Sequence, residues 1–178
     1  SESWGGMEML ALDTAYSLSR AGIKTTMICL NNTRLCEEVK KKDIPFKTIN
    51  GFSYFNPFKT LSFSLFLKQN KFDIIHTHFS KDLWLLVPSL KMQNSSVPLI
   101  LTKHVGSFIQ KNDILHRFLY NRLTKVIAIS KVIERNLLDT CPLQPSKISL
   151  IYNPIDTAKF DKNTADRNKI RKEFSIEE

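Results

Sequence analysis

The chain has few of the residues that build disulfide frameworks, metal sites and glycine-rich phosphate loops. Its three cysteines, Cys29, Cys36 and Cys141, are odd in number and include no CxxC pair. Neither a disulfide framework nor a zinc ribbon is therefore indicated, and a reducing, cytoplasmic compartment fits this usage. The chain has only 5 glycines, and none of them forms a GxGxxG motif.

Several other signals are missing from the sequence. No apolar run approaches the roughly 20 residues that a helix needs to cross a bilayer. The N-terminus has no charged start followed by an apolar segment, so no export signal is indicated. There is also no aromatic RNA-binding strand, no recognition helix rich in Arg and Asn, and no zinc-finger spacing. We therefore expect no membrane span and no nucleic-acid partner.

What the sequence does contain is typical of one globular domain. The chain has 178 residues, 42% of them hydrophobic, which is enough for a proper core. Its formal net charge of +9 favours an anionic partner, such as a nucleotide diphosphate, acidic lipid or nucleic acid. The basic residues are scattered through the expected helices, so solvated helix faces are the more common explanation for them.

Short β-rich apolar runs alternate with helical patterns along the whole chain. Strands are expected at 24–30, 46–50, 73–78, 97–104, 125–130 and 147–153. Helices are expected from Gly6 to a stop at Gly22, at 33–43, after Asn56 and Pro57, and at 82–92, 113–123 and 131–140. This alternation predicts an α/β fold, a doubly wound, mostly parallel sheet of the Rossmann type. We expect six or so strands, and one more before residue 1 in the sheet centre.

Ligands of such sheets bind outside the carboxyl ends of the strands. The residues at those ends are polar: Thr77, His78, Lys103, His104, Gly106, Ser130 and Asn153. The loop with Gly5 and Gly6 lies on the same edge, at the head of the first helix. Glycines there can present bare N–H groups to an anion, although a tight turn explains them too. His76 and His78 share one face of their strand, but no carboxylate or cysteine cluster accompanies them, so we expect no metal.

Five segments occur in this order: "WGGMEMLALDTAYSLSRAGIKTTMI", "FDIIHTH", "VPLILTKHVGS", "KVIAISKVIERNLL" and "KISLIYNPIDTAKF". Together they resemble the N-terminal half of the family 4 glycosyltransferases of the GT-B fold. The best matches are the GGxE element at Gly5, Gly6 and Glu8, the strand that ends at His104, and "YNPID" from Tyr152. The resemblance implies one half of a GT-B enzyme, with a retaining, metal-independent mechanism and a nucleotide sugar as co-substrate.

The resemblance also implies roles for individual residues. Gly5 and Gly6 would approach the donor diphosphate, and His104 would hydrogen-bond a hydroxyl of the donor sugar. The alternative for His104 is a satisfied histidine at a strand end. Glu8 fits a favourable interaction with the helix dipole as well as a place in the cleft. The cleft would be lined by Trp4, Glu8, His78, Lys103, Gly106, Ser130 and Asn153.

The domain plan follows from the same resemblance. Residues 1–160 would form the acceptor-side domain, and residues 161–178 would begin the linker towards a donor-binding domain beyond Glu178. The family's paired glutamates eight apart are not found within this chain, so we expect the chain alone to transfer no sugar. Pro154 follows Asn153, where the family often has glycine; proline stiffens that turn.

The acceptor is expected to be a glycan or lipid-linked molecule, such as lipopolysaccharide or another cell-envelope glycoconjugate. Many relatives work at the inner face of the bacterial cytoplasmic membrane, so peripheral contact with an anionic membrane is a further expectation. A segment rich in aromatic residues and lysine fits an acceptor loop, a membrane-facing helix or core packing. Its aromatic residues are Phe52, Tyr54, Phe55, Phe58, Phe63 and Phe66.

Two other functions stay open on the sequence alone. A nucleotide-sugar epimerase of similar fold would lack a second sugar site. A non-catalytic module that binds anionic membranes would show no response to nucleotide sugars.

Overall fold

The computed structural model describes residues 3–51, 56–155, 157 and 167–176. The helices are α1 (Gly6–Arg20), α2 (Arg34–Lys41), α3 (Pro57–Asn70), α4 (Leu83–Met92), α5 (Ile114–Asn121), α6 (Lys131–Thr140) and α7 (Arg167–Glu173). The strands are β1 (Met27–Leu30), β2 (Phe46–Ile49), β3 (Ile75–Thr77), β4 (Leu99–Lys103), β5 (Lys125–Ala128) and β6 (Ile148–Leu150). All six expected strands are present, each one shorter than the sequence predicted.

The strands form two parallel sheets, where the sequence predicted one. The first sheet has the order β1-β2, and the second has the order β3-β4-β5-β6. Every pairing among these strands is parallel. The predicted α/β fold with parallel strands is confirmed, although its strands fall into two sheets, because β1 and β3 share no ladder of hydrogen bonds among the described residues. A further strand in the sheet centre, expected from the sequence, stays a prediction.

Parallel register brings the strand ends to one edge. In the β3–β4 pair Ile75 lies opposite Leu99 and Thr77 lies opposite Leu101. Successive side chains of a strand point to opposite faces, so His76 and Thr102 lie on one face while Thr77 and Lys103 lie on the other. The two faces of the sheet therefore carry different polar side chains at its carboxyl edge.

Local sequence signals set the helix boundaries. Asn56 Oδ1 accepts a hydrogen bond from Lys59 N at 3.0 Å, and Pro57 is the first residue of α3, as expected. Gly22 has φ +83°, a left-handed conformation that favours glycine, and it ends α1 where the sequence placed a stop. Side chains of Thr33, Asp113 and Ser130 cap α2, α5 and α6 in the same way as Asn56.

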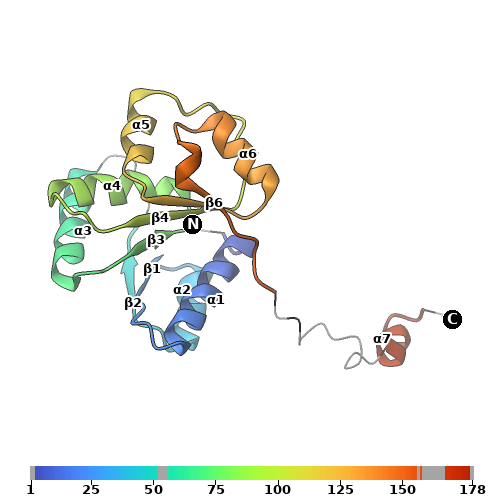
Figure 1. Ribbon diagram of the computed structural model, residues 1–178. Helices are drawn as coiled ribbons and strands as arrows, with labels where there is room; N and C mark the ends of the chain where they lie inside the picture. The colour runs from blue at the N-terminus through green and yellow to red at the C-terminus, as the bar shows by residue number, and fades with distance from the viewer. Residues whose placement is uncertain (1–2, 52–55, 156, 158–166, 177–178) are drawn as a thin grey trace.

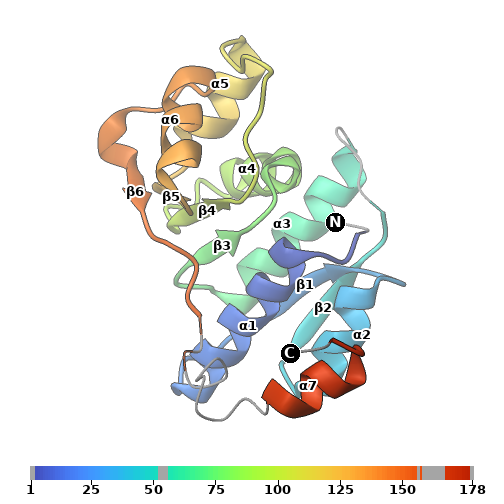
Figure 2. The ribbon, with the colours of Figure 1, turned by 90° about the vertical axis from the view of Figure 1, so that its right-hand side faces the viewer.

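Two hydrophobic clusters correspond to the two sheets. The larger one joins α3, α4, α5 and α6 to the four-stranded sheet and includes Leu99, Leu101, Val126 and Leu137. The smaller one joins α1 and α2 to β1 and includes Leu12, Cys29 and Val39. Figures 1 and 2 show α5 and α6 gathered beside β5 and β6, with α1 and α2 beside β1 and β2. None of the described helices combines the length and the apolar character that a bilayer crossing requires.

Candidate functional site at the carboxyl edge

Three histidines stand side by side on one face of β3 and β4. The rings of His76 and His78 have centroids 4.4 Å apart, and those of His78 and His104 are 5.3 Å apart and stacked. His78 Nδ1 and His104 Nε2 form a hydrogen bond of 3.1 Å. His76 Nε2 pairs with Thr102 Oγ1 at 2.8 Å. We call His76, His78 and His104 the histidine row.

The surroundings of the histidine row keep its imidazoles neutral near pH 7. Burial lowers the pKa of His78 to about 3, with further lowering by the neighbouring His76 and His104. The pKa of His104 is also lowered, chiefly by burial, while the carboxylate of Glu8 acts in the opposite direction. Burial and His104 lower the pKa of His76 as well, although its solvent-exposed side chain limits that effect. Neutral imidazoles both donate and accept hydrogen bonds, as contacts to sugar hydroxyls require.

Glu8 connects the glycine loop to the histidine row. Its Oε2 accepts a hydrogen bond from the N–H of Gly5 at 3.0 Å, so it caps α1. Its side chain is 4% exposed, and Oε1 is buried without a hydrogen-bond partner in the described part of the chain. The charge of Glu8 acts on His104, so the first turn of α1 lies near the end of β4. The sequence interpretation as a dipole-stabilising residue therefore describes only part of its role.

The backbone conformation does not require glycine at either of the two positions in this loop. Gly5, at φ −155° and ψ −166°, is extended, a conformation open to any residue. A Cβ at Gly6 would meet no atom within 4 Å. Because Glu8 occupies the N–H of Gly5, the following N–H groups of the first turn are the ones left for an external acceptor. Open space beside a bare helix start fits the approach of an anion.

Two further residues expected in the cleft have structural roles. A Cβ at Gly106 would lie 3.2 Å from Asn136 Oδ1, which itself accepts a hydrogen bond from Ser107 N at 2.8 Å. This close approach explains the glycine without a ligand. Ser130 Oγ accepts a hydrogen bond from Ile133 N at 3.2 Å, so it serves as the cap of α6.

The remaining cleft residues are spread over the edge. Trp4 packs against the cluster of α1 and α2, and the guanidinium of Arg34 lies 5.4 Å from its ring centre. Asn153 is exposed beyond the end of β6. Lys103 is 9% exposed and points to the face opposite the histidine row. Its surroundings were not anticipated from the sequence.

The aromatic segment contains both buried and exposed side chains, so core packing explains some of its residues and not others. Phe63 is buried at 7% exposure, and Phe66 packs against the same core cluster. Phe58 is 82% exposed. Phe52, Tyr54 and Phe55 lie outside the described residues.

The exposed apolar residues beyond β4 were missed on the sequence. Val105 is 70% exposed, Phe108 is fully exposed and Ile109 is 71% exposed. All three lie within five residues after His104, in the segment 105–109. Apolar residues in a loop after a strand end were the signal that could have found them.

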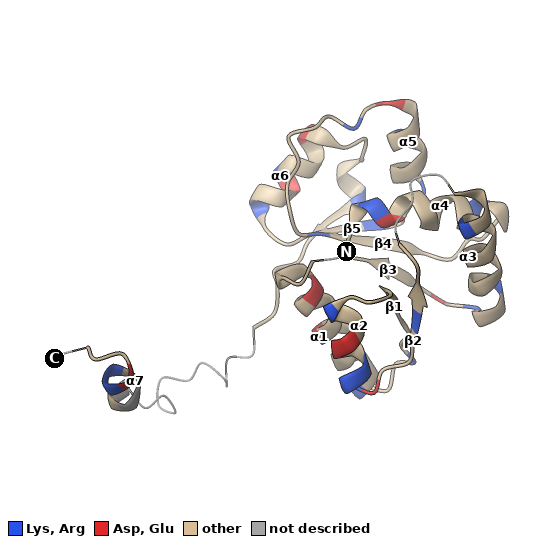
Figure 3. Ribbon diagram, turned by 180° about the vertical axis from the view of Figure 1, so that it is seen from behind, with Lys and Arg blue, Asp and Glu red and all other residues tan. Residues whose placement is uncertain are grey.

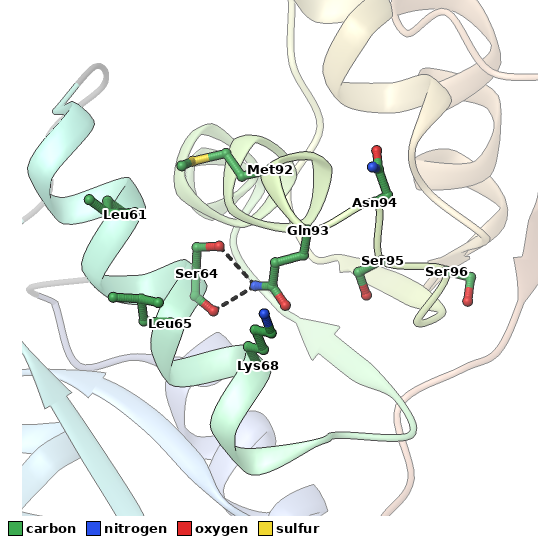
Figure 4. A pocket seen from close by; sticks show the side chains of 9 residues that line it. All are labelled: Leu61, Ser64, Leu65, Lys68, Met92, Gln93, Asn94, Ser95 and Ser96. Atoms are coloured by element: carbon green, nitrogen blue, oxygen red, sulfur yellow. Dashed lines mark hydrogen bonds between the residues drawn. The ribbon is translucent and has the colours of Figure 1, made fainter.

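Other features lie away from this edge. A hollow of about 470 Å³ opens between α3 and α4, where Gln93 Nε2 donates to Ser64 O and Oγ (Figure 4). Ser95 and Ser96, which precede β4, line this hollow. It therefore lies at the opposite end of β4 from His104. Figure 3 shows the positions of Lys and Arg spread along the ribbon over several helices, as the sequence indicated. Among the described residues no group of three or more potential ligands is placed to hold a metal ion.

The comparisons with known proteins decide the family. Residues 4–159 match the model of the family described as Glycosyltransferase Family 4. This chain belongs to that family. Comparison with curated protein sequences finds no match.

Solved structures agree with this fold. A glycosyltransferase from Rickettsia africae ESF-5 matches with a TM-score of 0.81 and 22% identity, over 98% of this chain and 47% of that one. HepE of Anabaena, solved with UDP and glucose, matches at 0.74 and 18%, over 98% of this chain and 48% of that one. The lipopolysaccharide outer core galactosyltransferase WaaB matches at 0.64 and 15%, over 88% and 44%. The chain thus spans about half the length of these structures and shares the GT-B half fold.

Glu8→Gln tests the link between α1 and the histidine row. The amide oxygen can still accept from Gly5 N–H, but the negative charge that raises the pKa of His104 is lost. We expect the pKa of His104, followed by NMR titration of its ring protons, to fall. Glu37→Gln, at an exposed position of α2, should leave it unchanged. An unaltered His104 pKa in Glu8→Gln would contradict the proximity described here.

The buried His78 predicts a loss of stability in mild acid. Its folded pKa is depressed to about 3, whereas its unfolded pKa is about 6.5. Below about pH 6.5 the unfolded chain therefore binds a proton that the native state does not, and stability falls by up to about 1.4 kcal/mol per pH unit. His78→Asn should flatten the pH dependence of urea unfolding between about pH 6 and 4. Its slope should match the wild type above pH 8, and equal slopes in acid would refute the assignment.

Proposed function

We propose that the chain is the acceptor-side domain of a retaining, metal-independent glycosyltransferase that uses a nucleotide sugar. One observation carries the proposal: Glu8 accepts a hydrogen bond from Gly5 in the glycine loop of α1, and its charge acts on His104 at the end of β4. Family membership supplies the reaction class. The residues at the carboxyl edge are assigned separate contacts with the diphosphate and with the sugar of the donor.

The glycine loop is the proposed contact for the donor diphosphate. The open space at Gly6 allows phosphate oxygens to reach the N–H groups of the first helical turn. Negative charge that develops on the departing diphosphate would be stabilised by these oriented donors. Glu8 fixes the loop by its bond to Gly5 N, so the donors are in place before the ligand arrives.

His104 is the proposed positioning contact for the donor sugar. Its imidazole is held by the 3.1 Å hydrogen bond between its Nε2 and His78 Nδ1. With a lowered pKa it is neutral near pH 7, and its other nitrogen is available to a sugar hydroxyl. Such a contact contributes mainly by orientation of the reacting carbon.

The acceptor is proposed to be a lipopolysaccharide or another cell-envelope glycoconjugate. WaaB, a lipopolysaccharide galactosyltransferase, shares the fold. The exposed Val105, Phe108 and Ile109 follow His104 and would lie against the lipid part of such an acceptor or a membrane surface. We accordingly propose a cytoplasmic protein in peripheral contact with the inner face of an anionic membrane.

The domain plan completes the proposal. Residues 1–160 form the acceptor-side unit, and residues 161–178 lead to a donor-binding half. On this plan the chain alone transfers no sugar, because most donor contacts are made by the other half. HepE was solved with UDP and glucose, and this chain covers 48% of it, which is consistent with a two-part site.

His104→Ala in the complete enzyme separates a site role from a structural one. Loss of an oriented hydrogen bond to reacting substrate costs about 2 to 4 kcal/mol, or roughly 10² to 10³ in kcat. The melting temperature should change little, because His104 is only half-buried and its lost bond is a single one to His78. Gly6→Val, which fills the open space, should also depress activity. Normal turnover with a lowered melting temperature in His104→Ala would assign the histidine to the fold alone.

The same assay distinguishes the two other functions. Isotope from the nucleotide sugar should appear in the envelope acceptor. If it stays in the nucleotide-sugar pool as a changed sugar, the protein is an epimerase. Salt-sensitive liposome binding with no effect of nucleotide sugar would instead favour a membrane-binding module.

A further inference from the structure

The face of β4 opposite the histidine row carries a buried lysine. Lys103 is 9% exposed, and its Nζ donates a hydrogen bond to Ser80 Oγ at 3.1 Å. Burial lowers its pKa, and a second lysine, Lys111, lowers it further. The hydrogen-bond partner of the Lys103 ammonium is thus the Ser80 hydroxyl. A carboxylate would be expected there, because a buried charge is usually paired with an opposite one.

Lys111 brings a second ammonium to the same place. Its N–H donates to Thr140 O at 2.8 Å, which holds the loop between β4 and α5 against the end of α6. Its Nζ is buried and has no hydrogen-bond partner in the described part of the chain. The charge of Lys111 acts on Lys103, so two like charges lie near each other in a buried part of the domain.

Tyr120 of α5 completes the cluster. It is 2% exposed, and its hydroxyl lies near Ser80 and Cys141 without a well-formed hydrogen bond to either. Burial raises the pKa of this hydroxyl, so it stays protonated and can donate. We call Ser80, Lys103, Lys111 and Tyr120 the lysine cluster.

In the described part of the chain, no carboxylate forms an ion pair with the lysine cluster, although Cys141 acts to raise the pKa of Lys103. Glu38 pairs with Lys41 on α2, and Asp113 pairs with His116, whose ring centre lies 6.5 Å from that of Tyr120. Asp82, close in sequence to Ser80, accepts from Thr77 Oγ1 at 2.6 Å and has a pKa raised by burial, which disfavours its charge. A buried ammonium without a counter-charge is costly, and an external anion relieves both lysines at once.

We propose that the lysine cluster binds a phosphate group. Two ammonium groups match the charge of a phosphate dianion, and the hydroxyls of Ser80 and Tyr120 supply further donors for its tetrahedral oxygens. This site lies on the opposite face of β4 from the glycine loop and the histidine row, so it is separate from the proposed diphosphate contact. The proposed phosphate site goes beyond the proposed function and does not depend on it.

Thermal unfolding with inorganic phosphate tests this site directly. We expect the melting temperature of the chain to rise by several degrees with phosphate at constant ionic strength, because binding to the native state stabilises it. Lys111→Met should abolish that rise. Without phosphate the variant should be as stable as the wild type or more so, because a buried uncompensated charge is replaced by an apolar side chain of similar size. Lys131→Met, at an exposed position of α6, should keep the full response.

Two further arms keep this test separate from the proposed function. Gly6→Val, which blocks the glycine loop, should retain the phosphate response if the lysine cluster is the site. Acetate at equal ionic strength should give a much smaller rise, and glucose 6-phosphate a rise comparable to phosphate. An equal response in wild type and Lys111→Met, or its loss in Gly6→Val, overturns the proposal. Absence of transferase activity would leave these outcomes unchanged.

Discussion

The alternation of side chains along β4 is the constraint on which the rest of the site depends. Because neighbouring residues of a strand face opposite ways, His104 and Lys103 lead to two different environments at one strand end. Parallel register with β3 then sets His78 beside His104 and places the Ser80 turn beside Lys103. A slip of one residue would exchange the two faces, so the buried apolar residues of β4 fix the polar edge as well as the core.

The buried carboxylate of Glu8 and the buried ammonium of Lys111 share one property. Each has an unpaired polar atom inside the described structure, at a place where a paired or apolar group would be more stable. Both flank the end of β4, one on each face. Incomplete pairing of this kind is expected where a ligand supplies the missing partner, and the scattered positive charge of the remaining surface needs no such explanation.

Much of the fold follows from local patterns, which the sequence displays directly. The cap at Asn56, the stop at Gly22 and the β-rich runs all gave elements that the structure confirms. The division into two sheets did not follow, because hydrogen bonding between distant strands is a tertiary property. The sequence also could not reveal that a side chain at position 106 would crowd Asn136, since this contact joins residues 30 apart. Lys111 lies in a loop that has no hydrophobic periodicity, so the neighbouring residues gave no signal that its Nζ is buried.

Amide and imidazole chemical shifts during a titration with UDP test the central claim most directly. The account places the diphosphate contact at the start of α1 and the sugar contact at the end of β4. It therefore predicts that the largest shifts occur at the Gly6 and Met7 amides and, with UDP-glucose, at the His104 ring. Ser96, at the opposite end of β4, should not respond. Shifts concentrated around Gln93 and Ser96, with the α1 start unchanged, would contradict the account.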